Sequence, residues 1–382
     1  MSLALDRRSF ISTAALAAGS AFLPRMAFAA APTERRFIFI IQRGAADGLN
    51  IVIPYADPVY RTLRGALAID PAGATKLDGT FALHPGLTEI GKMYGEKQAL
   101  FAHAVASPYR ERSHFDGQNV LETGGETPYV VKDGWLNRLA GLVQGPHETA
   151  IALAPTIPPA LRGATPVTSY APSKIPAPSD DLMLRVGQLY ASDQQLHPLW
   201  SAALEARMVG AGVATEKGAA ALGQLAASFL IKPDGPRIAM LETGGWDTHS
   251  AQDTRLNAQL KQLDALVAAL RTGLGTYWGK TTVLIATEFG RTAAVNGTGG
   301  TDHGTGAVTM LLGGSVNGGR VLADWPGLAT SQLYEGRDLR PTLDLDAFIT
   351  SAAAEGLALD PERVARQLFS RASQRPISGL VV

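Results

Sequence analysis

The stretch "RIAMLETGGWDTHSAQDTRLNAQLKQLDALVAALRTGLG", residues 237–275, decides the fold because it joins a buried strand to a long helix through a short loop. Its first six residues form an apolar run of strand length. After Ser250, leucine and valine recur every three or four residues, which is the spacing of one face of an α-helix. Ser250 can cap the start of this helix, and Gly273 or Gly275 can end it.

Similar apolar runs occur along the rest of the chain. "RRFIFIIQRGAADGLN" contains a buried strand at residues 37–41, and further runs lie at residues 99–105, 149–154, 281–287 and 307–314. Segments with helical periodicity separate several of these runs. The alternation predicts an α/β domain with a largely parallel central sheet flanked by helices. In such sheets the functional loops follow the carboxyl ends of the strands.

Residues 155–232 depart from this alternation. The segment begins rich in proline, serine and alanine and continues into two helical stretches, at about residues 181–208 and 216–231. We interpret it as a surface loop and a helical insertion within a single α/β domain that spans residues 30–382.

The composition excludes several classes of function. The 382 residues include 34 basic and 34 acidic side chains, and this balance favours neither nucleic acid nor an anionic membrane surface as a partner. Cysteine is absent, which excludes disulfides, thiolate metal sites and a cysteine nucleophile. Any metal must therefore be bound by oxygen and imidazole.

The first 29 residues have the features of an export signal. Arg7 and Arg8 precede a modest apolar stretch, and residues 27–29 form a small-x-small cleavage site. This segment resembles a twin-arginine signal, so we expect a periplasmic or secreted protein that uses the twin-arginine export machinery. The alternative is an amphipathic or buried N-terminal helix. The apolar stretch is too short and too rich in alanine for a stable membrane span.

Two pairs of aspartate and histidine lie on glycine-rich loops beside expected strands. Asp247 and His249 are one residue apart, and Asp302 adjoins His303. Carboxylate and imidazole together suit zinc, manganese or iron, and a set dominated by carboxylates can bind calcium or magnesium. Taken singly, each pair can instead be explained by helix capping or by an ordinary turn. Together they predict a divalent metal site.

Two further stretches supply candidate site residues. Glu288 and Arg291 follow an expected strand at the end where ligands bind, although an ion pair at the sheet edge explains them equally well. Ser113, His114 and Asp116 stand at the start of a helical run, where the helix N-terminus favours an anion. As an alternative, Ser113 only caps that helix.

We expect these polar residues to converge at one end of the sheet, since each follows or adjoins the end of an expected strand. The set consists of the two Asp247–His249 ligand candidates with Asp47, Asp116, Glu288 and Asp302.

The motifs resemble an exported bacterial family catalogued as domain of unknown function 1501. The chain carries, in the family's order, "RGAADGLN", "SHFDGQ", "GGWDTH", "TEFGRT" and "TDHG". That family in turn resembles the alkaline phosphatase and sulfatase superfamily, whose members fold as an α/β sandwich and hydrolyse phosphate or sulfate esters with a metal pair. The resemblance implies the same sandwich fold for this chain.

The resemblance also implies roles for particular residues. Asp247, His249 and His303 fall at metal-ligand positions, and Glu288 stands where the superfamily has an aspartate. The first strand ends in Gln42 and Arg43, where the superfamily supplies an aspartate ligand, and Asp47 follows a few residues later.

The superfamily's nucleophile position falls at Ser113 or His114. The implied function is an exported metal-dependent hydrolase of phosphate or sulfate esters, with zinc, manganese or calcium as the metal. In it, Arg43 or Arg291 binds the anionic group, and either Ser113 or a metal-bound hydroxide attacks. The alternative is a non-catalytic exported binding or assembly protein that retains the fold.

Overall fold

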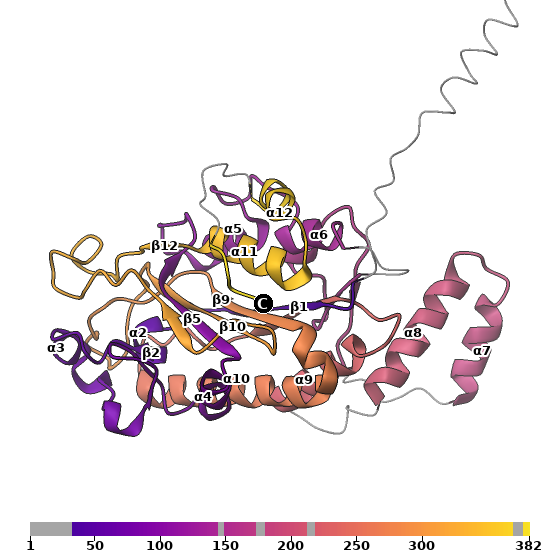
Figure 1. Cartoon of the computed structure of the whole chain (residues 1–382). Helices are drawn as coiled ribbons and strands as arrows, with labels where there is room; N and C mark the ends of the chain where they lie inside the picture. The colour runs from indigo at the N-terminus through magenta and orange to yellow at the C-terminus, as the bar shows by residue number, and fades with distance from the viewer. Residues whose placement is uncertain (1–32, 144–148, 173–179, 212–217, 370–376) are drawn as a thin grey trace, which may run out of the picture. The chain divides into compact units, whose positions relative to one another are not determined.

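A large mixed sheet lies at the centre of the structure (Figure 1). The computed structural model describes residues 33–143, 149–172, 180–211, 218–369 and 377–382. In this part of the chain nine strands form the sheet, in the order β11-β5-β10-β9-β1-β8-β6-β7, with β12 paired to β5. Their bounds are β1 Arg36–Gln42, β5 Ala99–Ala106, β6 Ala150–Ala152, β7 Thr168–Ser169, β8 Ile238–Thr243, β9 Thr281–Thr287, β10 Ala307–Leu312, β11 Arg320–Leu322 and β12 Leu343–Asp344.

The sheet is mostly parallel, as the alternation of strands and helices predicted. Strand β1 pairs in parallel with both β8 and β9, and β6 pairs in parallel with β8. Strand β10 is the exception, because it runs antiparallel to both β5 and β9. The six apolar runs identified in the sequence all form strands of this sheet.

Helices cover both faces of the sheet (Figure 1). On β1, Ile38 and Ile40 face one layer, while Phe37 and Phe39 face the other. This is the alternation of side chains along a strand, and all four residues are buried because both faces are covered. The first layer contains α4 (Thr88–Gly95), α9 (Ala219–Leu230) and α10 (Gln252–Leu274). The second contains α6 (Trp135–Ala140), α11 (Leu345–Leu357) and α12 (Pro361–Leu368), and α5 (His114–Thr123) contacts α6.

The long helix α10 begins differently from the expectation. Its N-cap is Ala251, in the left-handed conformation at φ +47°, and no side chain caps the first turn. Ser250 therefore does not cap the helix, because the chain still belongs to the preceding loop at that residue. Gly275, at φ +52°, follows the last helical residue, so the expected glycine stop is present.

Residues 155–232 form more than a helical insertion. They contribute the edge strand β7 and helix α9, which packs along α10. The first of the two expected helical stretches is divided into α7 (Asp180–Tyr190) and α8 (Leu196–Ala211), which contact each other. The remaining small elements are α2 Gly48–Ile51, α3 Tyr60–Arg64, a second sheet of β2 Val52–Ile53, β3 Thr75–Lys76 and β4 Ala82–Leu83, and the 3-10 turns η1 Gly65–Leu67, η2 Pro71–Gly73, η3 Pro159–Leu161 and η4 Gly275–Lys280.

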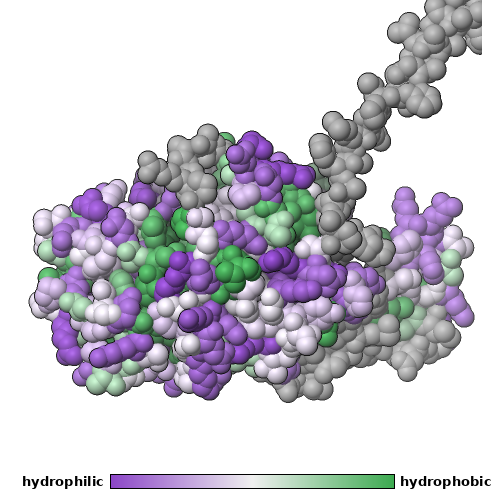
Figure 2. Space-filling model, viewed as in Figure 1, coloured by the Kyte–Doolittle hydropathy of each residue, from purple (hydrophilic) through white to green (hydrophobic). Residues whose placement is uncertain are grey.

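On the face shown in Figure 2, hydrophilic residues are interspersed with smaller hydrophobic patches. Within the described residues, no helix has the length and apolar character needed to cross a membrane. The export signal expected at residues 1–29 lies outside the described residues.

Candidate metal centre

Four loops meet along the edge of the sheet that is formed by the carboxyl ends of its parallel strands. Strands β1, β8 and β9 end level with one another, because Gln42 pairs with both Thr243 and Thr287. The chain continues from these strands into Arg43, into the loop that carries Asp247, and into Glu288. Strand β10 runs the opposite way, so the loop that precedes it brings His303 to the same edge. The ligand candidates from distant parts of the sequence are thus assembled where parallel sheets bind their ligands.

Three imidazole rings converge on the carboxylate of Asp247. Its Oδ1 lies 2.9 Å from His249 Nε2 and 3.3 Å from His303 Nε2. Its Oδ2 lies 3.4 Å from His114 Nε2. The Nε2 atoms of His249 and His303 are 2.9 Å apart. The structure therefore brings Asp247, His249 and His303 together and adds His114 from α5.

This donor set fits a divalent cation. One ligand atom from each of His114, Asp247 and His303 lies within 4.8 Å of the other two. His114 Nε2 is buried and makes no hydrogen bond within the described part of the chain, and a bound cation would satisfy it. Ligands that each lie about 2.1 Å from a tetrahedrally coordinated ion are roughly 3.4 Å apart, close to the 3.4 Å and 3.3 Å that separate the Asp247 oxygens from His114 Nε2 and His303 Nε2. Imidazole nitrogen with carboxylate oxygen suits zinc or manganese better than calcium.

The outer ring nitrogens of His303 and His114 are held by acceptors. His303 Nδ1 lies 2.9 Å from the carbonyl oxygen of Arg112, which can only accept a hydrogen bond. His114 Nδ1 lies 2.8 Å from Glu288 Oε1. Placing the protons on these Nδ1 atoms leaves the Nε2 lone pairs directed at the cluster, which is how acceptors behind metal-bound histidines orient the rings. Burial, followed by the nearby His114, lowers the pKa of His303, which favours the neutral form of this ring.

Glu288 contacts the outer nitrogen of His114, on the side of the ring that faces away from the cluster. It is buried, and its Oε1 accepts hydrogen bonds from Gly44 N at 2.8 Å and Gln118 Nε2 at 3.0 Å as well as from His114. Burial raises the pKa of Glu288, but these hydrogen bonds outweigh it and leave the pKa below its ordinary value. Glu288 therefore orients His114 and does not join the three ligand candidates.

Gly44 allows the first loop to approach the Asp247 loop closely. Its φ is +118°, and a Cβ at this position would lie 2.7 Å from the backbone nitrogen of Asp247. Only glycine tolerates both conditions. The N–H of Gly44 therefore reaches Glu288 while the backbone of Asp247 passes alongside.

Arg291 forms an ion pair with Asp247. The guanidinium is buried, its Nη1 donates to Asp247 Oδ1 at 2.6 Å, and its Nε donates to Thr301 Oγ1 at 3.1 Å. Burial raises the pKa of Asp247, but Arg291 more than offsets this effect and the pKa is lowered. Arg291 thus keeps the carboxylate ionised, and the anion-binding role expected for it would require this ion pair to open.

Asp302 and His249 form the outer part of the site. His249 Nδ1 lies 3.0 Å from Asp302 Oδ1, which also accepts from Asn296 Nδ2 at 3.1 Å. Hydrogen bonds from Asn296 and then His249 lower the pKa of Asp302. Both side chains are about as exposed as Asp247, so this part of the site is open to solvent.

Asp47 and Arg43 are placed differently from the expectation. Asp47 is buried and binds Arg64 and Gln252, so the structure does not bring it to the ligand atoms. Arg43 donates to Glu122 at 2.8 Å and to Glu242 at 2.6 Å. Its charge is already neutralised by these carboxylates, which does not favour the expected role of binding a substrate anion.

Asp116 is also separate from the cluster. Its Oδ2 accepts a hydrogen bond from Tyr109 at 3.4 Å, and its carboxylate interacts with the hydroxyl of Tyr129. Ser113 occupies the N-cap position of α5, but its side chain makes no capping hydrogen bond. The alternative that Ser113 serves only as a helix cap therefore lacks the capping hydrogen bond that it requires.

Sequence reasoning missed Gln118. This residue accepts from Arg43 Nη1 at 2.9 Å and donates to Glu288, so it joins the Arg43 ion pairs to the metal centre. A signal was available, because Gln118 follows His114 by four residues and therefore lies on the same face of α5. The carbonyl group of Arg112 left no such signal in the sequence.

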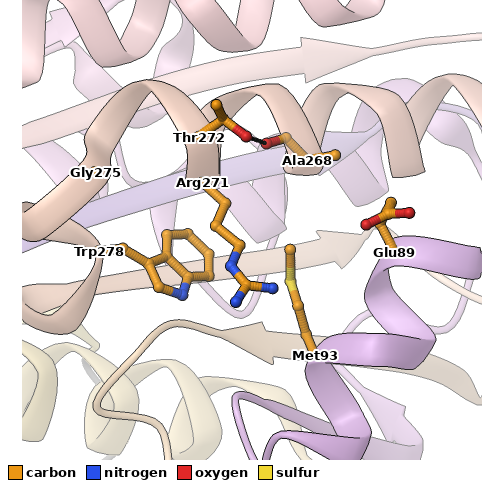
Figure 3. A pocket seen from close by; sticks show the side chains of 7 residues that line it. All are labelled: Glu89, Met93, Ala268, Arg271, Thr272, Gly275 and Trp278. Carbon is orange, nitrogen blue, oxygen red and sulfur yellow. Dashed lines mark hydrogen bonds between the residues drawn. The ribbon is translucent and has the colours of Figure 1, made fainter.

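A cavity of about 390 Å³ lies at the opposite end of α10 (Figure 3). Its lining includes Met93, Arg271 and Trp278. Arg271 is paired with Glu96 at 2.7 Å. The helix runs for about 30 Å between this cavity and the metal centre, at 1.5 Å per residue. The cavity therefore belongs to a different part of the molecule.

Comparison with known proteins identifies similar structures. No curated protein matches the chain. The C-terminal periplasmic domain of EcEptC from Escherichia coli, in complex with Zn, is 9% identical with a TM-score of 0.38, over 75% of this chain and 77% of that one. BT1596, a 2-O GAG sulfatase, is 12% identical with a TM-score of 0.42, over 90% and 76%. The phosphonate monoester hydrolase of Agrobacterium radiobacter is 10% identical with a TM-score of 0.32, over 75% and 70%.

These solved structures are similar to this chain only distantly, with TM-scores below 0.5. TM-scores this low carry no argument about substrate or activity. The family comparison covers residues 34–369, almost the entire span of described residues, and the chain therefore belongs to the family described as "Protein of unknown function (DUF1501)".

Proposed function

We propose that this chain is an exported, metal-dependent hydrolase of phosphate or sulfate esters. One observation carries the proposal: the Nε2 atoms of three histidines surround the Asp247 carboxylate, and the buried Nε2 of His114 makes no hydrogen bond among the described residues. A buried polar atom without a partner is costly unless a ligand satisfies it. Such an atom at the carboxyl edge of an α/β sheet favours a binding role over a purely structural one.

His114, Asp247 and His303 would hold the cation, and His249 with Asp302 would limit its access from solvent. A bound divalent cation would neutralise the charge that develops on the ester oxygens. The N-terminus of α5 lies beside these ligands because His114 is its first residue, and its free N–H groups favour an anion there. Ser113, whose side chain does not cap α5, or a water molecule would attack the ester.

The rival function is a non-catalytic exported binding or assembly protein. The ion pairs of Arg43 and Arg291 favour this rival. Both arginines were expected to bind the substrate anion, but both are paired with carboxylates of the protein. An enzyme for anionic esters would need to release one of them or rely on the cation and α5.

Turnover of the metal-loaded mature protein tests the proposal. We expect hydrolysis of p-nitrophenyl phosphate or p-nitrophenyl sulfate that chelator removes and added metal restores. His303→Ala should abolish this activity because it removes a ligand. His197→Ala makes the same change at an exposed position of α8 and should retain it. Tight metal binding without turnover of any phosphate or sulfate ester would favour the binding protein.

The exported location is part of the proposal. Arg7 and Arg8 precede an apolar stretch and a cleavage site in residues 1–29. Replacing both arginines with lysine should leave the precursor in the cytoplasm, as cell fractionation would detect. Unchanged export of this variant would contradict the twin-arginine assignment.

A further inference from the structure

A groove of about 540 Å³ lies along α5, the helix that begins at His114. It runs between α5 and the segment that follows β6, and its lining includes Arg43, Gln118 and Glu242. Gln118 also donates to Glu288, the carboxylate that holds His114. Gln118 therefore connects the groove to the metal centre, and a volume of this size is typical of small-molecule sites.

Two aromatic residues line the groove and remain open to solvent. Phe115 is 81% exposed and Tyr129 is 52% exposed. Phe115 directly follows the ligand candidate His114 on α5. Large apolar side chains that are exposed together beside a polar site commonly serve in binding.

The structure holds Tyr129 in a conformation that a bulky residue rarely adopts. Its φ is +64°, in the left-handed region. The backbone N–H of Tyr129 donates to Asn119 Oδ1 at 2.7 Å, and its hydroxyl interacts with Asp116. Two polar partners thus fix an exposed ring against a backbone preference, and strain of this kind tends to be concentrated at functional positions.

The remaining charges of the groove suit a ligand that is anionic overall. Glu122 and Glu242 both pair with Arg43 and exceed its charge by one, so the charge that favours an anion comes from other residues of the lining. Lys132 and Arg162 also line the groove and are exposed. The groove therefore combines two accessible cations with an aromatic wall.

We propose that this groove binds the alcohol part of the ester, and that Phe115 and Tyr129 select esters whose alcohol carries a flat ring. This inference rests on the proposed hydrolysis of phosphate or sulfate esters at the metal centre. The ring would stack on the aromatic side chains while the anionic group lies at the cation.

Binding of phenyl phosphate and methyl phosphate to the metal-loaded protein tests the inference. Calorimetry should show tighter binding of phenyl phosphate. Phe115→Ala should weaken that binding about 3- to 10-fold, the range expected for loss of an aromatic contact, and leave methyl phosphate unchanged. Tyr129→Asn should act in the same direction, because asparagine tolerates a positive φ. Val130→Ala is the matched control, since Val130 is 69% exposed and does not line the groove.

The outcomes separate this inference from the proposed function. Equal binding of the two esters, or an unchanged preference in Phe115→Ala, would overturn the role of the groove and leave the hydrolase intact. If neither ester binds, the hydrolase proposal fails, and phenol then serves as a neutral probe of the groove. Phenol contacts that are detected by saturation-transfer NMR and lost in Phe115→Ala would support the groove, and their absence would overturn it.

Discussion

Asp47→Asn should destabilise the protein strongly without removing its metal. Asp47 is 1% exposed and binds Arg64, which is fully buried. The other guanidinium nitrogens of Arg64 donate to the side chain of Asn50 and to the carbonyl oxygens of Thr292 and Ala293, so none of them offers a replacement charge. Removing one partner of a buried ion pair costs about 3–5 kcal/mol of unfolding free energy.

Asp70→Asn is a matched control. Asp47 accepts from Leu49 N at the start of α2, and Asp70 likewise accepts from a backbone N–H at a helix start. Asp70 also pairs with an arginine, Arg61, but this pair is 3.7 Å long and 68% exposed on the aspartate side. An exposed pair of this kind contributes about 0–1 kcal/mol. The control should therefore unfold close to the parent.

The assay is urea unfolding followed by tryptophan fluorescence, together with metal content per chain. The reasoning would be refuted if Asp47→Asn unfolded like Asp70→Asn. Loss of metal without loss of stability would instead restore Asp47 as a ligand.

Two further perturbations give quantitative expectations. Burial lowers the pKa of His103 to about 4 from its ordinary 6.5, so below pH 6.5 the unfolded chain takes up a proton that the folded chain refuses. The stability contributed at higher pH should be lost as pH falls from 6.5 to 4, by up to about 3 kcal/mol, and urea unfolding of His103→Gln should lack that part of the pH dependence. Asp338→Asn should weaken metal binding about 10- to 100-fold, as measured by competition with a chelator. Asp338 accepts from Arg112 Nε at 2.9 Å and thereby fixes the Arg112 carbonyl group that orients His303. Unchanged metal affinity would show that this support is dispensable.

The strands and the long helix could be predicted because their signals are local. Ile38 and Ile40 lie in a continuous apolar run, and the leucines of α10 recur at helical spacing. The direction of a strand has no such local signal, since nothing within residues 307–312 shows that β10 runs antiparallel to β5 and β9. That reversal is what brings His303 to Asp247.

Site residues could be predicted where they follow the ends of strands. They could not be predicted where a charged side chain pairs with a residue that is distant in the sequence. Asp47 and Arg43 have suitable chemistry and suitable positions in the sequence. Their partners, Arg64 and Glu122, come from other elements, and only the folded chain shows that these charges are used internally. The resemblance implies a nucleophile at Ser113 or His114, and in the structure His114 Nε2 faces Asp247 together with the other imidazoles.

The measurement that tests the central claim most directly is the metal content of the protein purified from its native compartment, compared between the parent and Asp247→Asn. The parent should carry a divalent metal, and chelator should lower its melting temperature. Asp247→Asn should lose most of that metal because it removes the carboxylate around which His114, His249 and His303 converge. A parent without metal, or a variant that keeps the parent's metal content and response to chelator, would contradict the account.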